Sequence, residues 1–361
     1  MDLIEPRSRD ELLAVLAAAS AEHRTLLPVG GGTHLAKGNP TEVDAHLSLR
    51  RFDRIVELDP AEQMAMVEAG LSCAALDVAL AEHGLEWPVD APPGATVGGV
   101  IASATSSPRR LRTGPVRDLV LGVSLATGDG RWIRGGGRTV KNVSGFDLTR
   151  LLVGSLGTLG ILVEVVLRLL PRPRARRTIV ASGGLHAAAR VLSTVPRPTA
   201  VLVAPELVEL RLEGWPEDVE AQSALAASVL DAPHIADEAP FPATELCAPA
   251  PVVVEAAVPG SRLGDLAEAA GGCWAGLMGV GVLWVGLPDA GASLTDLRAR
   301  ALTLGGIAPV VRGPGGLGSS PGFADQLVLQ GRIKAALDPG GILAPGRFWG
   351  EARATDERNE R

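Results

Sequence analysis

The stretch Leu26-Leu27-Pro28-Val29-Gly30-Gly31-Gly32-Thr33-His34-Leu35 decides how the rest of the sequence is interpreted. Its apolar start has the character of a β-strand, and this strand ends at three glycines followed by a hydroxyl residue. Glycine adopts backbone angles that strain other residues, so such a turn can direct several backbone N–H groups toward one point. The pattern favours an anion site for a phosphate or pyrophosphate, with an ordinary glycine-rich loop as an equal alternative.

Two further glycine-bearing turns follow the first one. Residues 88–103 contain three prolines, three glycines and a run of small residues, which would let a flat ligand approach the backbone closely. Residues 154–171 begin with a small-residue turn and continue as a long apolar strand that ends at a proline. Three such turns in one region favour a ligand site more strongly than one glycine-rich turn would.

The spacing of these glycines argues against two common nucleotide-binding motifs. Leu35 stands where the last glycine of a Gly-x-Gly-x-x-Gly nicotinamide motif would be, and the glycines from residue 154 recur at every third position instead. Lys37 is followed by Gly38, so the first turn does not end in the Gly-Lys-Ser/Thr of a nucleotide-hydrolysing loop. The ligand is therefore of another kind.

Composition narrows the class of protein. The chain has 361 residues, of which 46% are hydrophobic and 21% charged, and this predicts a folded globular protein of two or three domains. A net charge of -7 argues against non-specific binding of nucleic acid, which needs surplus Lys and Arg. The acidic start Met1–Pro6 is unlike a signal peptide, and the apolar stretches are too short to span a membrane, so we expect a cytoplasmic location.

The cysteines and the domain boundaries add two predictions. Cys73, Cys247 and Cys273 are far apart in sequence, so they indicate neither a disulfide framework nor an iron–sulfur cluster, and no metal site is predicted. The Pro- and Arg-rich run at residues 171–177 predicts a domain boundary. The expected divisions are a first domain, a compact α+β domain, a C-terminal helix and turn returning to the first domain, and a disordered tail: residues 1–172, 173–322, 323–350 and 351–361.

Taken together, the motifs resemble the FAD-binding family typified by vanillyl-alcohol oxidase and p-cresol methylhydroxylase (PCMH). The matching segments are residues 28–35, 92–103, 117–130, 154–171, 338–342 and 345–347. Within that family the resemblance is greatest to the E subunits of bacterial glycolate oxidases, on the evidence of residues 107–110, 113–118 and 141–151. The resemblance implies an α+β fold, with a two-lobed PCMH-type FAD-binding domain followed by a smaller α+β cap domain.

The resemblance also implies which residues contact FAD. The pyrophosphate would be held, without a covalent link to the protein, by the first turn: Pro28, Gly30, Gly31, Gly32, Thr33 and His34. The cofactor would run toward its flavin along the second turn: Pro92, Gly94, Thr96, Gly98, Gly99 and Ser103. The third turn would lie beside it from the other side: Gly157, Gly160 and Ile161.

Catalytic residues are harder to assign. The catalytic relatives carry a histidine-rich motif in the C-terminal half, whereas only His186 and His234 follow residue 83 here, and Ala344 replaces the asparagine usual before the final Pro-Gly-Arg. Several arginines could neutralise a carboxylate or phosphate, and several aspartates could act as bases, with surface roles as the competing interpretation. These candidates are Arg109, Arg110, Arg112, Arg347, Asp90, Asp118 and Asp147. The sequence leaves the catalytic group unknown.

Three functions follow from the resemblance. The first is an FAD-binding subunit of a glycolate oxidase-like complex, in which a catalytic flavoprotein subunit oxidises a small 2-hydroxy acid and an iron–sulfur subunit accepts the electrons. The second is a self-sufficient FAD-dependent 2-hydroxy-acid or alcohol dehydrogenase. The third is a non-catalytic scaffold with a vestigial flavin site. Such partners imply a cytoplasmic chain or one attached peripherally to the inner membrane.

Overall fold

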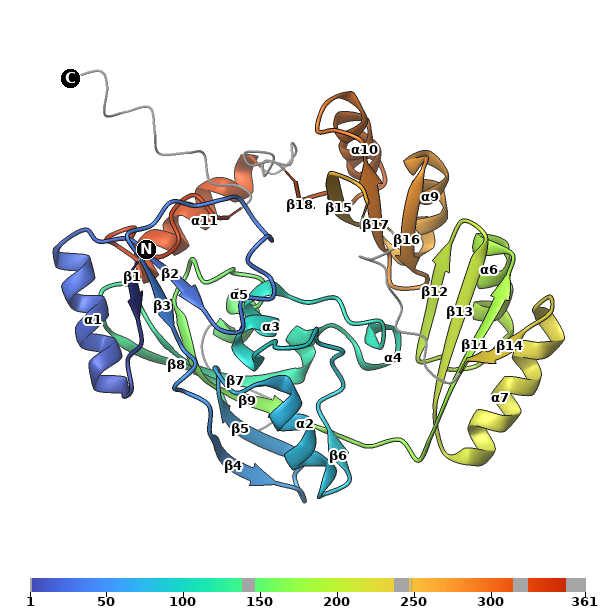
Figure 1. Cartoon of the computed structure of the whole chain (residues 1–361), viewed down its shortest axis with the longest axis horizontal. Helices are drawn as coiled ribbons and strands as arrows, with labels where there is room; N and C mark the ends of the chain where they lie inside the picture. The colour runs from blue at the N-terminus through green and yellow to red at the C-terminus, as the bar shows by residue number, and fades with distance from the viewer. Residues whose placement is uncertain (1, 138–146, 237–246, 248, 314–323, 349–361) are drawn as a thin grey trace. The chain divides into compact units, whose positions relative to one another are not determined.

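The computed structural model describes residues 2–137, 147–236, 247, 249–313 and 324–348. The chain forms two compact units (Figure 1). Unit 1 comprises Met1–Thr105, Pro115–Arg172 and Phe323–Arg361, and unit 2 comprises Ser106–Gly114 and Pro173–Gly322. Unit 1 is therefore discontinuous along the sequence, because most of unit 2 is inserted into it. The short segment 106–114 packs with unit 2 although it lies within the first division of the sequence.

The first part of unit 1 is a parallel sheet in the order β1-β3-β2, with helix α1 packed against it. The bounds are β1 Asp2–Ile4, α1 Arg9–Ala21, β2 Leu26–Val29 and β3 Ala45–Ser48. Ser8 caps α1, since its hydroxyl accepts the backbone N–H of Glu11 at 3.2 Å. Leu12 and Leu16 of α1 are fully buried with Leu26 of β2. The first glycine turn begins where β2 ends.

The second part of unit 1 is an antiparallel five-stranded sheet in the order β4-β5-β9-β7-β8. Its elements and their neighbours are β4 Ile55–Asp59, β5 Met64–Glu68, α2 Cys73–Ala81, β6 Leu85–Glu86, α3 Val97–Ser103, η1 Val116–Leu119, β7 Val120–Ala126, β8 Trp132–Gly136, α5 Leu148–Leu152, β9 Ile161–Arg168 and β10 Leu170–Pro171. β7 and β8 pair as an antiparallel hairpin around Gly128-Asp129-Gly130. The central strand β9 pairs with both β5 and β7. The second and third glycine turns lead into α3 and β9.

The C-terminal part of unit 1 is helix α11, Ala324–Leu337, with the segment that follows it (Figure 1). That segment runs beside β2 as a parallel bridge. The N–H of Leu26 donates to the carbonyl of Ile342 at 2.8 Å, and the N–H of Ala344 donates to the carbonyl of Leu26 at 2.8 Å. The end of the described chain is thereby hydrogen-bonded to the strand that precedes the first glycine turn.

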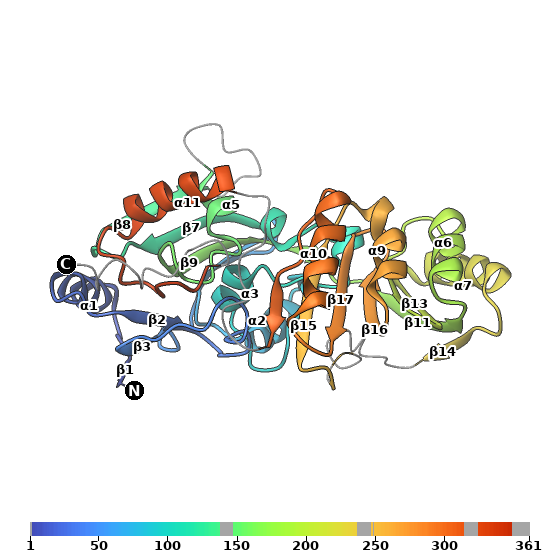
Figure 2. The ribbon, with the colours of Figure 1, turned by 90° about the horizontal axis from the view of Figure 1, so that it is seen from above.

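Unit 2 is an antiparallel eight-stranded sheet in the order β14-β11-β13-β12-β16-β17-β15-β18. Its elements are α4 Arg110–Thr113, β11 Ala175–Ser182, α6 Gly184–Thr194, β12 Ala200–Ala204, β13 Leu207–Gly214, α7 Pro216–Val229, β14 His234–Ala236, β15 Val252–Ala257, η2 Gly260–Arg262, α9 Leu263–Ala270, β16 Cys273–Leu277, β17 Val282–Leu287, α10 Ala292–Thr303 and β18 Val310–Arg312. Figure 2 shows α6, α7, α9 and α10 together on one side of these strands.

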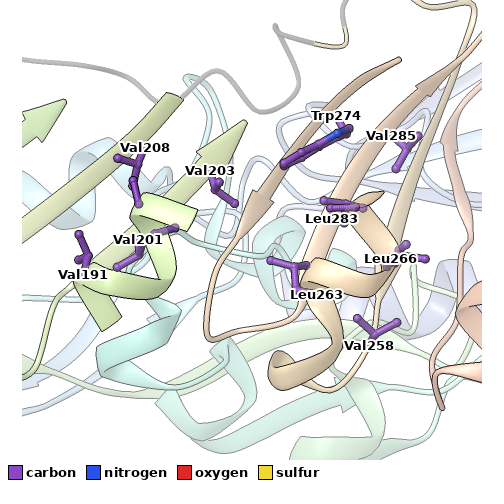
Figure 3. Packing of buried hydrophobic residues seen from close by; sticks show 14 of the residues in the cluster. Val191, Val201, Val203, Val208, Val258, Leu263, Leu266, Trp274, Leu283 and Val285 are labelled. Atoms are coloured by element: carbon purple, nitrogen blue, oxygen red, sulfur yellow. The ribbon is translucent and has the colours of Figure 1, made fainter. Parts of the chain in front are cut away.

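Alternation along the strands of unit 2 sorts its side chains between the two faces of the sheet. On the helix-covered face, Trp274 of β16 and Leu283 of β17 pack with Leu263 and Leu266 of α9 (Figure 3). Ala200 of β12 belongs to a smaller cluster on the other face, formed by residues that alternate along the strands with Trp274 and Leu283. Because both faces of this sheet are buried, its strands are nearly continuous apolar runs in the sequence. Each fully buried Leu stabilises the fold by about 1.5–3 kcal/mol relative to an exposed one.

Candidate cofactor-binding site

A pocket of about 730 Å³, its open mouth included, lies in unit 1 where the three glycine turns meet. The predicted cofactor contacts that line it are Pro28, Gly30, Gly31, Gly32, Thr33, His34, Thr96, Gly98, Gly99, Ser103, Gly157, Gly160 and Ile161. The two predicted residues outside the lining are Pro92 and Gly94. Segments that are more than 120 residues apart along the chain, from Pro28 to Ile161, therefore share one cavity.

Gly94 nevertheless shapes the pocket through its backbone. A Cβ atom on Gly31 would lie 1.9 Å from the carbonyl oxygen of Gly94, a distance that no side chain tolerates. The carbonyl of Pro92 accepts the N–H of Ala95 at 3.0 Å, which closes the second turn. Gly94 itself has φ +79, in the region that favours glycine. Pro92 and Gly94 thus form the turn against which the first glycine loop packs.

Thr96 joins the first turn to helix α3. Its hydroxyl caps the helix by accepting the N–H of Gly99 at 3.3 Å. The same oxygen would lie 2.2 Å from a Cβ on Gly30, so the missing side chain is what lets the loop approach the cap. Gly98 is similarly confined, because a Cβ there would lie 2.7 Å from the Cβ of Ala69. The glycines leave this part of the pocket lined by a cradle of backbone without side chains.

The orientation of the Gly30–Gly31 peptide suits an anion. The Nε of Arg50 donates to the carbonyl oxygen of Gly30 at 3.3 Å. Because N–H and C=O point in opposite directions across a trans peptide, the N–H of Gly31 points away from Arg50. Gly32 follows with φ +78, which turns the chain sharply. Successive amides in such a turn form an anion-binding concavity.

His34 lies in a chain of polar side chains at the pocket. Its Nδ1 is 3.0 Å from the hydroxyl of Thr33, and its Nε2 is 3.2 Å from the hydroxyl of Thr105. Thr105 is in turn 2.9 Å from the hydroxyl of Ser103, whose Oγ donates to the carbonyl of Val100. The imidazole is thereby fixed at both nitrogens, and it links the first glycine turn to the end of α3.

Arg347 is a pocket residue that the sequence offered only as a general candidate. Its Nη2 donates to the carbonyl of Leu35 at 2.9 Å and to that of His34 at 3.5 Å. Burial lowers the pKa of Arg347 from its ordinary value, but the guanidinium of arginine stays protonated in proteins. It therefore places a positive charge in the pocket and holds the loop that follows the triple glycine.

Two polar side chains anchor the segment that carries Arg347. The Nδ2 of Asn39 donates to the carbonyl of Gly346 at 3.0 Å, and the hydroxyl of Thr41 donates to the carbonyl of Pro345. The N–H of Asn39 donates to the carbonyl of Arg347 at 2.9 Å. The closing Pro-Gly-Arg is thus held by the loop that begins at the triple glycine. This pairing explains why both motifs belong to one site.

The other candidate charges lie elsewhere. Arg109 is in unit 2, where its guanidinium donates to Glu213 at 2.9 and 3.1 Å, and Arg112 donates to the backbone carbonyl of Glu213. Asp147 caps α5, and a hydrogen bond from Thr149 holds its pKa below the ordinary value. None of these three side chains lines the pocket, so none of them offers it a base. The segment 141–146 lies outside the described residues.

The remaining lining is apolar and was missed by motif reasoning. These residues are Val29, Leu35, Leu49, Ala69, Ala102, Leu156 and Leu162. Val29, Leu35 and Leu156 lie next to or near the glycines in the sequence, whereas tertiary packing brings Leu49 and Ala69 to the pocket. An apolar wall with a few polar groups is typical of pockets that take an organic cofactor.

Within the residues that the structure describes, no group of three or more His, Cys, Asp or Glu side chains could hold a metal ion. Across the same residues, no helix is long and apolar enough to cross a membrane.

Comparison with known proteins identifies the class of protein to which this chain belongs. Residues 3–136 match the family of FAD binding domains. The solved structure of an alkyldihydroxyacetonephosphate synthase superposes with a TM-score of 0.68, covering 95% of this chain and 75% of that one at 16% identity. A likeness at that identity shows the fold alone. The fold is therefore that of PCMH-type FAD-binding proteins, as the sequence motifs predicted.

The sequence relatives narrow the class to a family. The glycolate oxidase subunit GlcE of Escherichia coli is 30% identical over 363 residues, which cover 94% of this chain and 97% of that protein. The chain belongs to this family of FAD-dependent oxidoreductases, and FAD is its cofactor.

Other relatives match over a shorter length. The glycolate oxidase subunit GlcD of Bacillus subtilis is 36% identical over 54% of this chain, and the D-lactate dehydrogenase of Archaeoglobus fulgidus is 38% identical over 48% of it. These matches cover 42% and 39% of the two relatives, so the chain spans less than half the length of either.

Proposed function

We propose that the unit 1 pocket binds FAD non-covalently, with the pyrophosphate at the triple glycine of residues 30–32. The backbone cradle supports this role, because side chains are excluded at Gly30 and Gly31 by Thr96 and Gly94. The turn offers amide N–H groups to the anion, and Arg347 adds a cationic side chain nearby. The apolar wall around Leu49 and Leu162 suits the flat ring system.

The proposed chemistry divides between cofactor and protein. FAD supplies a reversible two-electron acceptor for electrons removed from a hydroxyl-bearing carbon. The protein positions it: Gly157 and Gly160 allow close approach on one side, and α3 with its cap does so on the other. The Thr33–His34–Thr105 chain fixes the imidazole at the pocket. These residues bind and orient, and none of them is assigned as the base.

We further propose that the chain is the FAD-binding subunit of a glycolate oxidase-like complex. In this complex a separate catalytic flavoprotein oxidises a small 2-hydroxy acid, and electrons pass toward an iron–sulfur subunit. The observation that supports this best is the match to GlcE over 94% of this chain and 97% of that protein. A full-length match favours a shared role more than the partial matches to GlcD and D-lactate dehydrogenase do.

A self-sufficient FAD-dependent 2-hydroxy-acid dehydrogenase is the second candidate. The observation in its favour is the 38% identity to the D-lactate dehydrogenase over 48% of this chain. This candidate needs a base and a carboxylate-binding group beside the flavin, both supplied by this chain. A vestigial flavin site on a scaffold subunit remains as the outcome in which no FAD is bound.

Anaerobic spectroscopy of the purified chain separates these candidates. We expect a yellow protein whose flavin spectrum stays oxidised when glycolate or D-lactate is added alone. Bleaching should begin once the catalytic flavoprotein subunit is present. Bleaching by either acid without a partner would instead establish the self-sufficient dehydrogenase. A colourless, folded protein that takes up no added FAD would establish the scaffold.

Affinity purification of the tagged chain from its source tests the partners. The proposal expects stoichiometric recovery of a second flavoprotein and of a protein with bound iron and acid-labile sulfide. Recovery of the yellow chain alone, under conditions that preserve other multisubunit flavoenzymes, would contradict the complex while leaving FAD binding intact.

A further inference from the structure

Two cysteines of unit 2 that are far apart in sequence are neighbours in space. The Sγ atoms of Cys247 and Cys273 are 3.4 Å apart, and all three cysteines of the chain are reduced. A disulfide requires about 2.05 Å between sulfur atoms, so the two would have to approach by about 1.4 Å, which a small rotation of the side chains can supply. Because residues 247 and 273 are far apart in the sequence, the sequence alone does not predict that they are neighbours.

The sheet of unit 2 holds one member of the pair. Cys273 is the first residue of β16 and lies opposite Gly286 of β17. A Cβ atom on Gly286 would be 3.4 Å from the Cβ of Cys247 and 2.8 Å from that of Ala250. The absent side chain at Gly286 is therefore what lets the Cys247 turn settle onto the sheet beside Cys273.

Arg312 holds the other member. Its Nη2 donates to the carbonyl of Cys247 at 2.8 Å and to that of Ala250 at 3.2 Å. The N–H of Ala250 closes the turn by donating to the carbonyl of Cys247. The turn is thus tied to β18, and the thiol of Cys247 is fully buried next to the carbonyls of Cys273 and Trp284.

We propose that Cys247 and Cys273 are a redox-modification site, at which a low-molecular-weight disulfide oxidises the pair to a reversible intramolecular disulfide. The site is separate from the FAD pocket, because both cysteines belong to unit 2 and the pocket is lined by unit 1. It does not depend on the proposed function of the chain.

The reaction proceeds by two thiol–disulfide exchanges. In the first, the thiolate of Cys273 attacks one sulfur of the oxidant RSSR, forms a mixed disulfide and releases RS⁻. In the second, the sulfur of Cys247 attacks the Cys273 sulfur of the mixed disulfide, and its proton passes to the leaving group as RSH. The two protein thiols lose two electrons and two protons, and RSSR becomes two RSH.

Exposure sets the order of these steps. Cys273 is exposed, so a soluble oxidant reaches it first. Cys247 is buried, and burial together with its interaction with the Cys273 thiol raises the pKa of the Cys247 thiol well above its usual range. It is therefore inert toward dissolved oxidants, and it reacts because a mixed disulfide on Cys273 presents a sulfur atom directly against it. Attack on a neighbouring sulfur is the role of a resolving cysteine.

Oxidised glutathione is the probe for the test. The native full-length protein is incubated with it, then quenched with iodoacetamide in guanidinium chloride so that buried thiols are alkylated as well, and analysed by intact mass and peptide mapping. We expect a product lighter than the reduced protein by two hydrogen atoms, with Cys247 joined to Cys273 and Cys73 alkylated. Dithiothreitol should restore three alkylatable thiols.

Three variants distinguish a specific Cys247–Cys273 disulfide from non-specific oxidation of the cysteines. Cys247→Ser should stop at the mixed disulfide and retain one glutathione on Cys273, and Cys273→Ser should remain unmodified at Cys247. Cys73→Ser is the matched control and should behave as the wild type. Circular dichroism verifies that each variant is folded. The proposal is overturned if the wild type retains glutathione on Cys273 without closing, if Cys73 enters the cross-link, or if Cys247 reacts in Cys273→Ser.

Discussion

The place that a Cβ atom on Gly31 would occupy is 1.9 Å from the carbonyl oxygen of Gly94. Two turns that are 63 residues apart along the chain therefore pack backbone against backbone. The obstacle is a carbonyl group within a turn, and it cannot rotate aside as the end of a flexible side chain can. The cofactor cradle depends on this contact, because it fixes the first glycine turn against the second.

We predict that Gly31→Ala eliminates FAD retention. The new methyl group must displace one of the two turns, and overpacking of this kind costs about 1–3 kcal/mol of folding stability. The ratio of flavin to protein absorbance after gel filtration measures the loss. Gly264→Ala in α9 is the matched control, because nothing lies within 4 Å of a Cβ there. A folded Gly31→Ala protein with normal flavin content would show that the turn does not hold the cofactor.

We predict that Arg347→Gln weakens FAD binding about 10- to 100-fold. The substitution removes the charge and the hydrogen bond to Leu35 at 2.9 Å, and hydrogen bonds to charged groups contribute about 1.5–3 kcal/mol. Quenching of flavin fluorescence during titration gives the dissociation constant. Arg168→Gln, at an exposed position at the end of β9, should leave the constant unchanged. Equal effects of the two substitutions would argue for a general charge effect.

We predict that Asp338→Asn destabilises unit 1 by about 3–5 kcal/mol. The Asp338 side chain is fully buried, accepts the amides of Ile342 and Leu343, and pairs with Lys334 at 2.7 Å. Removing its charge leaves the partly buried ammonium without its counterion. Urea unfolding followed by fluorescence measures the change.

The control for this substitution is Asp265→Asn. Its partner is Arg262 in an exposed pair at the start of α9, so the cost should be less than about 1 kcal/mol. If both variants unfold at the same urea concentration, the buried pair does not anchor the C-terminal segment.

We predict that Glu209→Gln changes how the stability of unit 2 depends on pH. Burial raises the pKa of Glu209 above its ordinary value of 4.5, and the ion pair with Arg211 opposes this only in part. Just above pH 4.5 the native state therefore keeps a proton that the unfolded state releases, so the wild type loses stability as pH rises through this window.

Glu209→Gln has no such proton to lose. The free energy of unfolding of the variant minus that of the wild type should thus increase as pH rises above 4.5, and then level off. Urea titrations at half-unit pH intervals give this difference directly. A difference that decreases over the same window would mean that the pKa of Glu209 is lowered in the folded protein.

Local backbone demands explain what the sequence predicted well. Contacts admit no side chain at Gly30, Gly31 and Gly98, and Gly32 has a positive φ, so local backbone demands account for these glycines. The family resemblance then identified the cofactor class, which the comparisons confirmed.

Contacts between distant segments explain what the sequence did not predict. Leu49 and Ala69 directly follow β3 and β5, and nothing local distinguishes them from core residues. Arg109 follows the second glycine turn closely, yet it pairs with Glu213 in unit 2. A short segment can leave one unit and pack with another without any change in its own composition, so motif reasoning cannot assign it.

The discontinuity of unit 1 has a consequence for biosynthesis. The pocket is lined by residues from Pro28 to Arg347, and the segment that carries Arg347 is hydrogen-bonded to Leu26, Asn39 and Thr41. A growing chain therefore exposes every cradle glycine long before it can complete the cavity around them, and the whole insert of unit 2 must be translated in between. Cofactor capture at the proposed site therefore has to wait for the segment that carries Arg347, and ligand binding then stabilises the finished fold.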